Sequence, residues 1–210
     1  MTNTNKPLAS TAGYGEAAET LASRYESVPF ESVHAAVLSL LPTAPSRVLE
    51  VGAGTGRDAA ALAERGHRVT AVEPVPELRA IARRLRPNAA ITWGDAMLPE
   101  LAPVEGQFDL IWISAVWMHL DERERRESMR RLHELLAPGG QAIITLRHGP
   151  VPAGRRMFPV PPSETIAQAA ELGLRGVHLA DDGPDRLGRD DVRWSTVVVH
   201  NDADAAQDLP

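Results

Sequence analysis

Three glycines, Gly52, Gly54 and Gly56, alternate with single residues directly after the apolar stretch 47–51. Glycine carries no side chain, so the backbone N–H groups of such a turn can approach a ligand closely, and a helix N-terminus favours negative charge. A dinucleotide fingerprint would place its third glycine at position 57, where this chain has arginine. The stretch therefore predicts a nucleotide-binding turn between a strand and a helix, with a spacing that differs from the nicotinamide pattern.

Two glutamates flank this turn in the expected fold. Glu50 stands two residues before the first glycine, and we expect it to orient the turn. Glu73 ends the predicted strand 69–72. Ligands of open parallel sheets bind beyond the carboxyl ends of the strands, where a carboxylate can accept hydrogen bonds from both hydroxyls of a ribose. A solvated strand end is the alternative for Glu73.

The next two predicted strands, 89–93 and 108–114, also lead into polar residues. Asp95 and the backbone N–H of Ala96 follow the first strand, where they could read the amino edge of an adenine. The alternative role of Asp95 is to cap the short turn that follows. Ser114 ends the second strand, and we expect it to face a transferred group.

Two histidines could act as general bases. His119 lies between the predicted strand 108–114 and a helix whose N-cap is Asp121. Its alternative role is to shape the start of that helix. His148 leaves the predicted strand 141–146 on the ligand side, and its alternative role is a hydrogen bond within the following loop.

The stretch 148–162 is rich in proline, and a loop of this length in a compact domain is usually functional or disordered. Arg147 enters it from the ligand side, and Arg155 could meet either an anionic substrate or water. Large side chains near this loop and near the N-terminus are expected to wall an apolar substrate pocket, with core packing as their alternative. They are Tyr14, Tyr25, Trp117, Met157 and Phe158.

Strand and helix patterns alternate from Val48 to Leu146, which predicts an α/β fold with a parallel sheet and helices on both faces. We expect a single domain over residues 14–202. Its expected parts are an N-terminal helical cap (14–45), a ligand-binding core (46–147), a substrate loop (148–162) and a C-terminal helix with two strands (163–202). The polar ends 1–13 and 203–210 are predicted to be disordered.

Composition narrows the class of protein. The 210 residues carry a net charge of −6, so the broad basic field of a nucleic-acid-binding protein is missing and such a substrate is disfavoured. The chain has no cysteine, which excludes disulfides, zinc–thiolate sites and thiol nucleophiles. The residues at its N-terminus show no apolar core of a signal peptide, and no apolar run approaches the ~20 residues of a membrane span. We therefore expect a cytoplasmic protein without a membrane partner.

The pattern Glu50-x-Gly52-x-Gly54-x-Gly56, with the polar strand ends that follow, resembles the motif series of class I S-adenosylmethionine-dependent methyltransferases. The stretch 116–120, Val-Trp-Met-His-Leu, is similar to small stand-alone bacterial members. The resemblance implies a Rossmann-like, doubly wound, seven-stranded sheet of order 3-2-1-4-5-7-6 with strand seven antiparallel. It also implies S-adenosylmethionine as cofactor and S-adenosylhomocysteine as product. The cofactor-binding residues that it implies are Glu50, Gly52, Ala53, Gly54, Gly56, Glu73, Pro74, Asp95, Ala96 and Ser114.

Several absences narrow the methyl acceptor. No Asn-Pro-Pro-Tyr or Asp-Pro-Pro-Tyr follows the strand 108–114, which disfavours exocyclic amines of bases or of glutamine. Ser114 stands where catechol-type members carry a metal-binding aspartate, so we expect no metal. The resemblance thus predicts methyl transfer to O, N or S of a small molecule. Its alternatives are a peptide or protein side chain and a cofactor-binding regulator without catalysis. A nicotinamide oxidoreductase is disfavoured by the glycine spacing.

Overall fold

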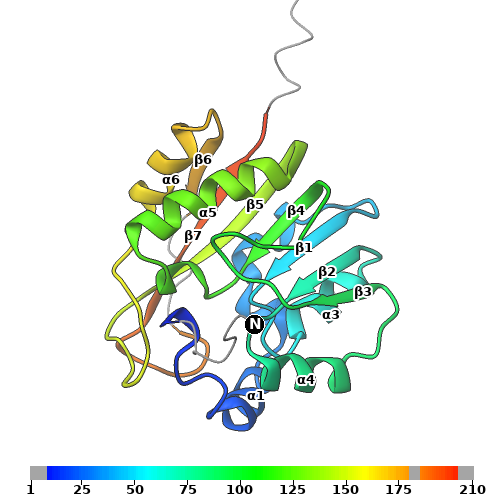
Figure 1. Cartoon of the computed structure of the whole chain (residues 1–210), viewed down its shortest axis with the longest axis vertical. Coiled ribbons are helices and arrows are strands. Elements are labelled where there is room, and N and C mark those ends of the chain that lie inside the picture. The colour runs from blue at the N-terminus through cyan, green and yellow to red at the C-terminus, as the bar shows by residue number, and fades with distance from the viewer. Residues whose placement is uncertain (1–8, 180–184, 203–210) are drawn as a thin grey trace, which may run out of the picture.

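The computed structural model describes residues 9–179 and 185–202, which form one seven-stranded sheet flanked by helices (Figure 1). The strand order is β3-β2-β1-β4-β5-β7-β6. Neighbouring strands from β3 to β5 are parallel, and β7 is antiparallel to both β5 and β6. The predicted order and the antiparallel seventh strand are therefore confirmed. The strands are β1 Arg47–Val51, β2 Arg68–Val72, β3 Ile91–Gly94, β4 Phe108–Ile113, β5 Leu136–His148, β6 Arg175–Leu179 and β7 Arg193–His200.

The helices cover both faces of this sheet, as the alternating pattern predicts. The α-helices are α1 Ala18–Glu26, α2 Phe30–Val33, α3 Arg57–Glu64, α4 Pro76–Leu85, α5 Glu122–Leu135 and α6 Pro162–Ala170. Three short 3-10 segments are η1 Ala9–Thr11, η2 Ala35–Leu40 and η3 Trp117–His119. Among the described residues, no helix is both long enough and apolar enough to cross a membrane.

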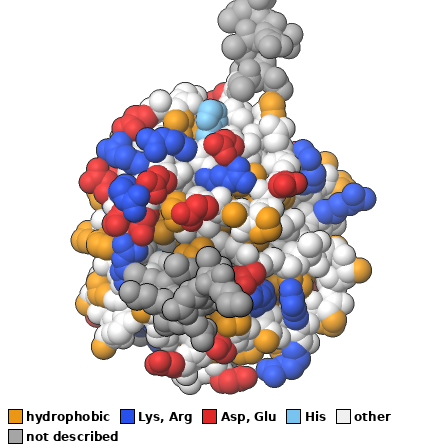
Figure 2. Space-filling model, in the orientation of Figure 1, with side chains coloured by type: hydrophobic (Ala, Val, Ile, Leu, Met, Phe, Trp, Pro, Cys, Tyr) orange, Lys and Arg blue, Asp and Glu red, His pale blue; other side chains and the backbone are white. Residues whose placement is uncertain are grey.

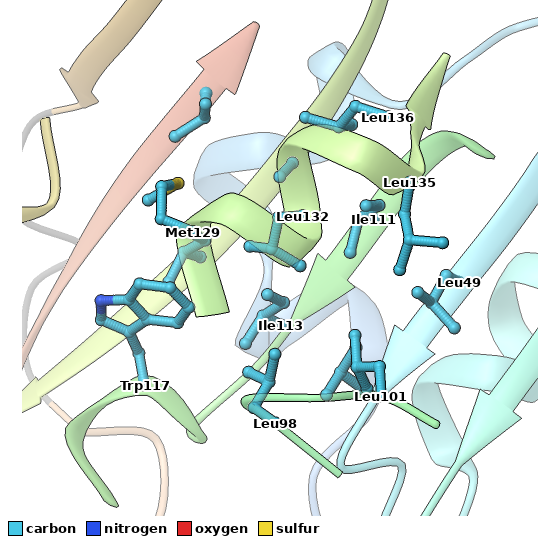
Figure 3. Close-up of a cluster of buried hydrophobic side chains, with 14 of the residues drawn as sticks. Leu49, Leu98, Leu101, Ile111, Ile113, Trp117, Met129, Leu132, Leu135 and Leu136 are labelled. Atoms are coloured by element: carbon cyan, nitrogen blue, oxygen red, sulfur yellow. The ribbon is translucent and has the colours of Figure 1, made fainter. Parts of the chain in front are cut away.

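Alternating strand residues supply two separate hydrophobic cores, since successive side chains of a strand point to opposite faces. Leu49 and Val51 of β1 belong to the core under α5 and α6, which Figure 3 shows in close-up. Val48 belongs to the core under α2, η2 and α3. A third, smaller cluster joins α1 to α4 through Ala22 and Leu78.

The capping residues of α5 fix where this helix starts. Asp121 is its N-cap and accepts a hydrogen bond from the backbone N–H of Glu124, whose side chain accepts one from the backbone N–H of Asp121. The N-cap that the sequence predicts is thus confirmed, and the two reciprocal hydrogen bonds form a capping box. Charges of both signs are interspersed over α5 and α6 (Figure 2), with ion pairs such as Arg126 to Glu171 at 2.7 Å.

The parallel register brings the ends of β1, β2 and β4 to the level of Thr145 within β5. Val51 pairs with Val72 of β2 and with Ile113 of β4, and Ile113 pairs with Ile144 of β5. The residues that follow these positions, Gly52, Glu73, Ser114 and Thr145, therefore lie along one edge of the sheet.

The N-terminal region differs from the sequence prediction in two places. The apolar pattern of residues 31–41 predicts one helix, but the structure has the short α2 followed by η2, because the backbone of Leu41 is extended and the segment packs as a 3-10 turn on α3. Residues 9–13, which lie within the stretch predicted to be disordered, include η1 and contact the loop after β5. Residues 1–8 and 203–210 lie outside the described part of the chain.

Candidate functional site

A cavity of about 450 Å³ lies beyond the carboxyl ends of β1, β2, β4 and β5. The sheet edge supplies its floor, while α1, the N-terminal segment before it and the loop after β5 supply its walls. Most of the predicted site residues meet here. Those that line the cavity are Tyr14, Tyr25, Glu50, Gly52, Ala53, Gly54, Glu73, Pro74, Ser114, His119, Arg147, Arg155 and Met157.

The three glycines of the turn have positive φ angles of 71°, 57° and 75°, which L side chains rarely adopt. A Cβ on Gly52 would lie 2.4 Å from Val116, and a Cβ on Gly56 would lie 2.5 Å from Trp93. A Cβ on Gly54 would meet only Tyr25, at 3.9 Å. Gly54 therefore leaves open space in front of the backbone. Gly56 does not line the cavity, and its place in the pattern is explained by packing against Trp93.

Glu73 connects the glycine turn to the end of β2. Its side chain accepts hydrogen bonds from the backbone N–H groups of Gly54 at 2.8 Å and of Val75 at 2.9 Å. The residue is only 4 % exposed, and this burial raises the pKa of its carboxyl group despite both hydrogen bonds. Each carboxylate oxygen accepts one backbone hydrogen bond, so each keeps acceptor capacity for a ligand hydroxyl.

A buried polar cluster lies beneath the turn. Asp58 accepts hydrogen bonds from the Trp112 indole at 3.0 Å and pairs with His34 at 2.7 Å. Burial alone would raise the pKa of Asp58, but His34 and Arg57 outweigh it and hold this pKa below its usual range. Glu50 is buried beside them. Its burial raises its pKa, and repulsion from the charge of Asp58 raises this pKa further.

Sequence reasoning did not identify Asp58 or His34 as residues of this cavity. An acidic residue in the first turn of the helix after a glycine turn was the available signal for Asp58. His34 had no such signal, because η2 is placed against α3 only by tertiary packing.

A second part of the cavity, here called its second end, is formed around His119, which makes two hydrogen bonds. Its Nδ1 lies 2.7 Å from the backbone carbonyl oxygen of Arg156, and its Nε2 lies 3.0 Å from the Tyr14 hydroxyl. A carbonyl oxygen can only accept, so Nδ1 carries the proton and Nε2 accepts from the Tyr14 O–H. Burial lowers the pKa of His119, and the positive charges of Arg155 and Arg147 lower it further. The imidazole is thus neutral, with its lone pair on the side of Tyr14.

The N-terminal segment and the loop after β5 meet over this end (Figure 1). The Arg155 guanidinium lies 3.7 Å from the centre of the Tyr14 ring and donates a hydrogen bond to the backbone oxygen of Ala12 at 3.0 Å. Arg156 ties the same loop to the start of α5 through Glu124 at 2.7 Å. Segments more than 140 residues apart in the sequence therefore close one wall of the site.

Ala115 adds local strain at the sheet edge. It is a non-glycine residue with a φ of 59°, and its backbone N–H donates to the Thr145 hydroxyl at 2.9 Å. Both residues line the cavity and both were missed by the sequence analysis. Strain of this kind persists where surrounding contacts hold it and is frequent at functional sites.

The structure places His148, Trp117 and Phe158 outside the cavity. His148 pairs through Nε2 with the Ser195 hydroxyl at 2.7 Å, because β7 lies against β5 at this point. Trp117 is fully buried and lies beside Met129 in the core shown in Figure 3. The Arg156 guanidinium lies over the Phe158 ring, 4.8 Å from the centre of that ring. The expected roles of these three residues in the site are therefore not supported by their positions.

Asp95 and Ala96 also differ from the expected adenine contact. The Asp95 side chain is largely exposed and pairs with Arg79 of α4 at 2.8 Å. Ala96 is buried in the core under α5. Met97 and Leu98, the next two residues, line the cavity instead. The predicted segment thus reaches the cavity through Met97 and Leu98, and the adenine contact of Asp95 and Ala96 stays a prediction.

With this geometry established, comparison with known proteins indicates the family. Residues 48–140 match the family model described as a methyltransferase domain. Over these residues the chain is similar to methyltransferase domains of the S-adenosylmethionine-dependent class. An uncharacterised methyltransferase of Mycobacterium tuberculosis is 34% identical over 102 residues, which are 49% of this chain and 40% of that protein. The matched part of the chain thus spans about half the length of the curated relatives.

Solved structures share the methyltransferase fold. The 1,6-didemethyltoxoflavin N1-methyltransferase of Burkholderia thailandensis, solved with its substrate and S-adenosylhomocysteine, has a TM-score of 0.61 at 22% identity, covering 93% of this chain and 92% of its own. The [4+2]-cyclase SpnF has a TM-score of 0.68 at 14% identity, covering 89% and 93%. The same fold therefore occurs in proteins that are named for different reactions.

Proposed function

We propose that this methyltransferase-fold protein transfers a methyl group from S-adenosylmethionine to a hydroxyl oxygen of a small molecule. The observation that carries the proposal is one cavity that joins an open glycine turn and a buried carboxylate at one end to a neutral histidine at the other. Its volume, about 450 Å³, lies in the range of small-molecule sites. The small-molecule methyltransferase among the structural neighbours supports the same substrate class.

The residues at the first end fit the cofactor on two observations. Gly54 leaves space in front of the backbone, and Oε2 of Glu50 is buried without a hydrogen-bond partner among the described residues. Glu73 would hold the ribose hydroxyls, and the side of the cavity formed by Met97 and Leu98 would hold the adenine. When bound, S-adenosylmethionine supplies an activated methyl group on its sulfonium.

His119 supplies the base in this proposal. The backbone oxygen of Arg156 keeps the proton on Nδ1, so Nε2 is free to take a proton from the acceptor hydroxyl once that hydroxyl replaces the Tyr14 O–H. Arg155 holds Tyr14 over the site, and the closed wall excludes water. The chain otherwise orients the two reactants, which accounts for much of the rate in such transfers.

The test has two stages. Calorimetry with S-adenosylmethionine, S-adenosylhomocysteine and NAD comes first, followed by incubation of the protein with methyl-labelled S-adenosylmethionine and a fractionated cell extract. We expect both sulfur compounds to bind, NAD not to bind, and label to appear in the small-molecule fraction. Label in the protein fraction would instead support a peptide or protein acceptor. Binding without transfer to any fraction would support a cofactor-binding regulator.

A further inference from the structure

Two buried arginines of this chain differ in their partners. Arg125 of α5 is 3 % exposed and forms an ion pair with Glu164 at 2.8 Å. Arg147 at the end of β5 is 8 % exposed, lines the cavity and has no carboxylate within ion-pair distance among the described residues. A buried charge without a counter-charge is costly, and proteins keep one mainly where a ligand supplies the opposite sign.

The hydrogen bonds of Arg147 leave one edge of its guanidinium unused. Nη1 donates to the backbone oxygen of Pro150 at 2.9 Å and lies 3.9 Å from the Met157 sulfur. Nε is buried and has no hydrogen-bond partner in the described structure. Because Nε–H and Nη2–H point the same way, this edge offers two parallel donors. That fork matches the two oxygens of a carboxylate.

Charges of both signs act on Arg147. Burial and then Arg189 lower its pKa, while Asp185 and Asp191 act in the opposite direction without forming an ion pair with it. Arg155 lines the same end of the cavity, stacks on Tyr14, and donates to a backbone oxygen but to no described carboxylate. Arg189 also lines the cavity, although its charge is matched by its ion pair with Asp185. In a chain with a net charge of −6, this end of the cavity therefore carries two guanidiniums without matching carboxylates among the described residues.

We propose that the methyl acceptor is a small carboxylic acid whose carboxylate binds the Nε–Nη2 edge of Arg147, with Arg155 as the second cation. This inference rests on the proposed function, since it names the class of molecule that occupies the acceptor end of that site. Arg147 lies 3.9 Å from the sulfur of Met157, and His119 donates to the backbone oxygen of the neighbouring Arg156, so the bound carboxylate and the base would lie beside the same loop. The carboxylate would thereby orient the acceptor with its hydroxyl toward Nε2.

The experiment measures binding, so it does not depend on turnover. The protein saturated with S-adenosylhomocysteine is titrated with matched probes that carry an aromatic ring: benzoate and benzamide, salicylate and salicylamide, and phenyl phosphate. At least one carboxylate should bind ten-fold or more tightly than its amide. Equal binding of every acid and its amide, or no binding by either carboxylate, would overturn the proposal. Tighter binding of phenyl phosphate than of both carboxylates would overturn the choice of a carboxylate.

Two variants assign the effect to a residue. Arg147→Met should lower the ratio of carboxylate affinity to amide affinity at least ten-fold. Its affinity for S-adenosylhomocysteine should stay within two-fold of the parent value. Arg193→Met is the control, because Arg193 lies nearby on β7, is exposed and does not line the cavity. It should leave the preference intact. If Arg147→Met instead weakens S-adenosylhomocysteine binding ten-fold, Arg147 binds the cofactor and the proposal is wrong.

Thermal unfolding gives an independent readout. Without ligand, Arg147→Met should unfold at the same temperature as the parent or higher, since it removes an unmatched buried charge. Arg125→Met should unfold at a lower temperature, because it leaves Glu164 without its partner. A large loss of stability in Arg147→Met would show that the arginine is structural. Failure of S-adenosylhomocysteine to bind the parent protein would count against the proposed function and would be seen before any carboxylate is added.

Discussion

The cavity has one end that is built from adjacent strand ends and another that is assembled from distant segments. At the first end, Gly54 and Glu73 lie at the ends of the neighbouring strands β1 and β2 and are joined by a hydrogen bond of 2.8 Å. At the second end, Tyr14, His119 and Arg155 come from the N-terminus, from η3 and from the loop after β5. The first end depends on a local pattern that many folds of this type share, and the second depends on contacts particular to this chain.

The ends also differ in charge. Glu50 and Glu73 at the first end, and Arg147 and Arg155 at the second, have no ion-pair partner among the described residues, whereas Arg57 and Asp185, which also line the cavity, are paired. A cofactor with a ribose and a positively charged sulfonium suits the former, and an acidic acceptor suits the latter. Variants that affect only one end test whether the two functions are separate.

Gly54→Val should remove detectable binding of S-adenosylhomocysteine. The side chain would fill the open space in front of the turn, and the φ of 57° adds a strain of roughly 1–2 kcal/mol. Gly106→Val is the matched control, since Gly106 has a φ of 89° and a Cβ there would meet nothing within 4 Å. Calorimetry on both variants separates loss of the ligand space from backbone strain. Normal binding by a folded Gly54→Val would show that the turn does not hold the cofactor.

His119→Gln should lower turnover by ~100-fold or more without weakening cofactor binding, because a general base contributes on that order. The pKa of His119 is lowered, and the base is its neutral form, which predominates above that pKa. Activity of the parent should therefore be level above the ordinary histidine value of 6.5 and decline only at lower pH. His148→Ala is the control, and a comparable loss of turnover there would return the role to His148.

Glu73→Ala should weaken S-adenosylhomocysteine binding at least ten-fold, which corresponds to about 1.5–3 kcal/mol for a charge-assisted pair. It also leaves two backbone N–H groups without an acceptor, so thermal unfolding must be measured alongside. Asp95→Ala provides the comparison at the same end. Equal loss of affinity in Asp95→Ala would mean that Asp95 turns from Arg79 to the ligand.

Tyr14→Phe should change turnover by less than about ten-fold, the scale of one neutral hydrogen bond. Its ring can still stack under Arg155, while Nε2 of His119 loses the hydroxyl that the acceptor would replace. Steady-state kinetics with the acceptor found in the extract assay provide the measurement. A loss as large as that of His119→Gln would place Tyr14 itself in the proton transfer.

The sequence allowed the cofactor end to be predicted because its signals are local. A glycine turn after an apolar run, followed by an acidic strand end, predicted that Gly54 and Glu73 would share a site, and the parallel register brings them together. Even here, spacing alone could not distinguish the roles of Gly54 and Gly56. Gly54 leaves space for a ligand, whereas Gly56 makes room for Trp93.

The acceptor end required the tertiary structure. His119 and His148 were equivalent candidates in the sequence, and only the packing of β7 against β5 directs His148 to Ser195. Trp117 was predicted in the pocket by its position, but the two faces of a segment cannot be assigned before its packing is known.

Composition and periodicity by themselves determined that this chain forms an α/β sheet with a ligand turn at the end of its first strand, because those features repeat over short distances. Tertiary structure alone decided that His119 is neutral with its lone pair toward Tyr14, since that state depends on a backbone oxygen 37 residues away. It also decided that Arg147 lacks a counter-charge among the described residues, since a side chain's partners come from every element that packs around it.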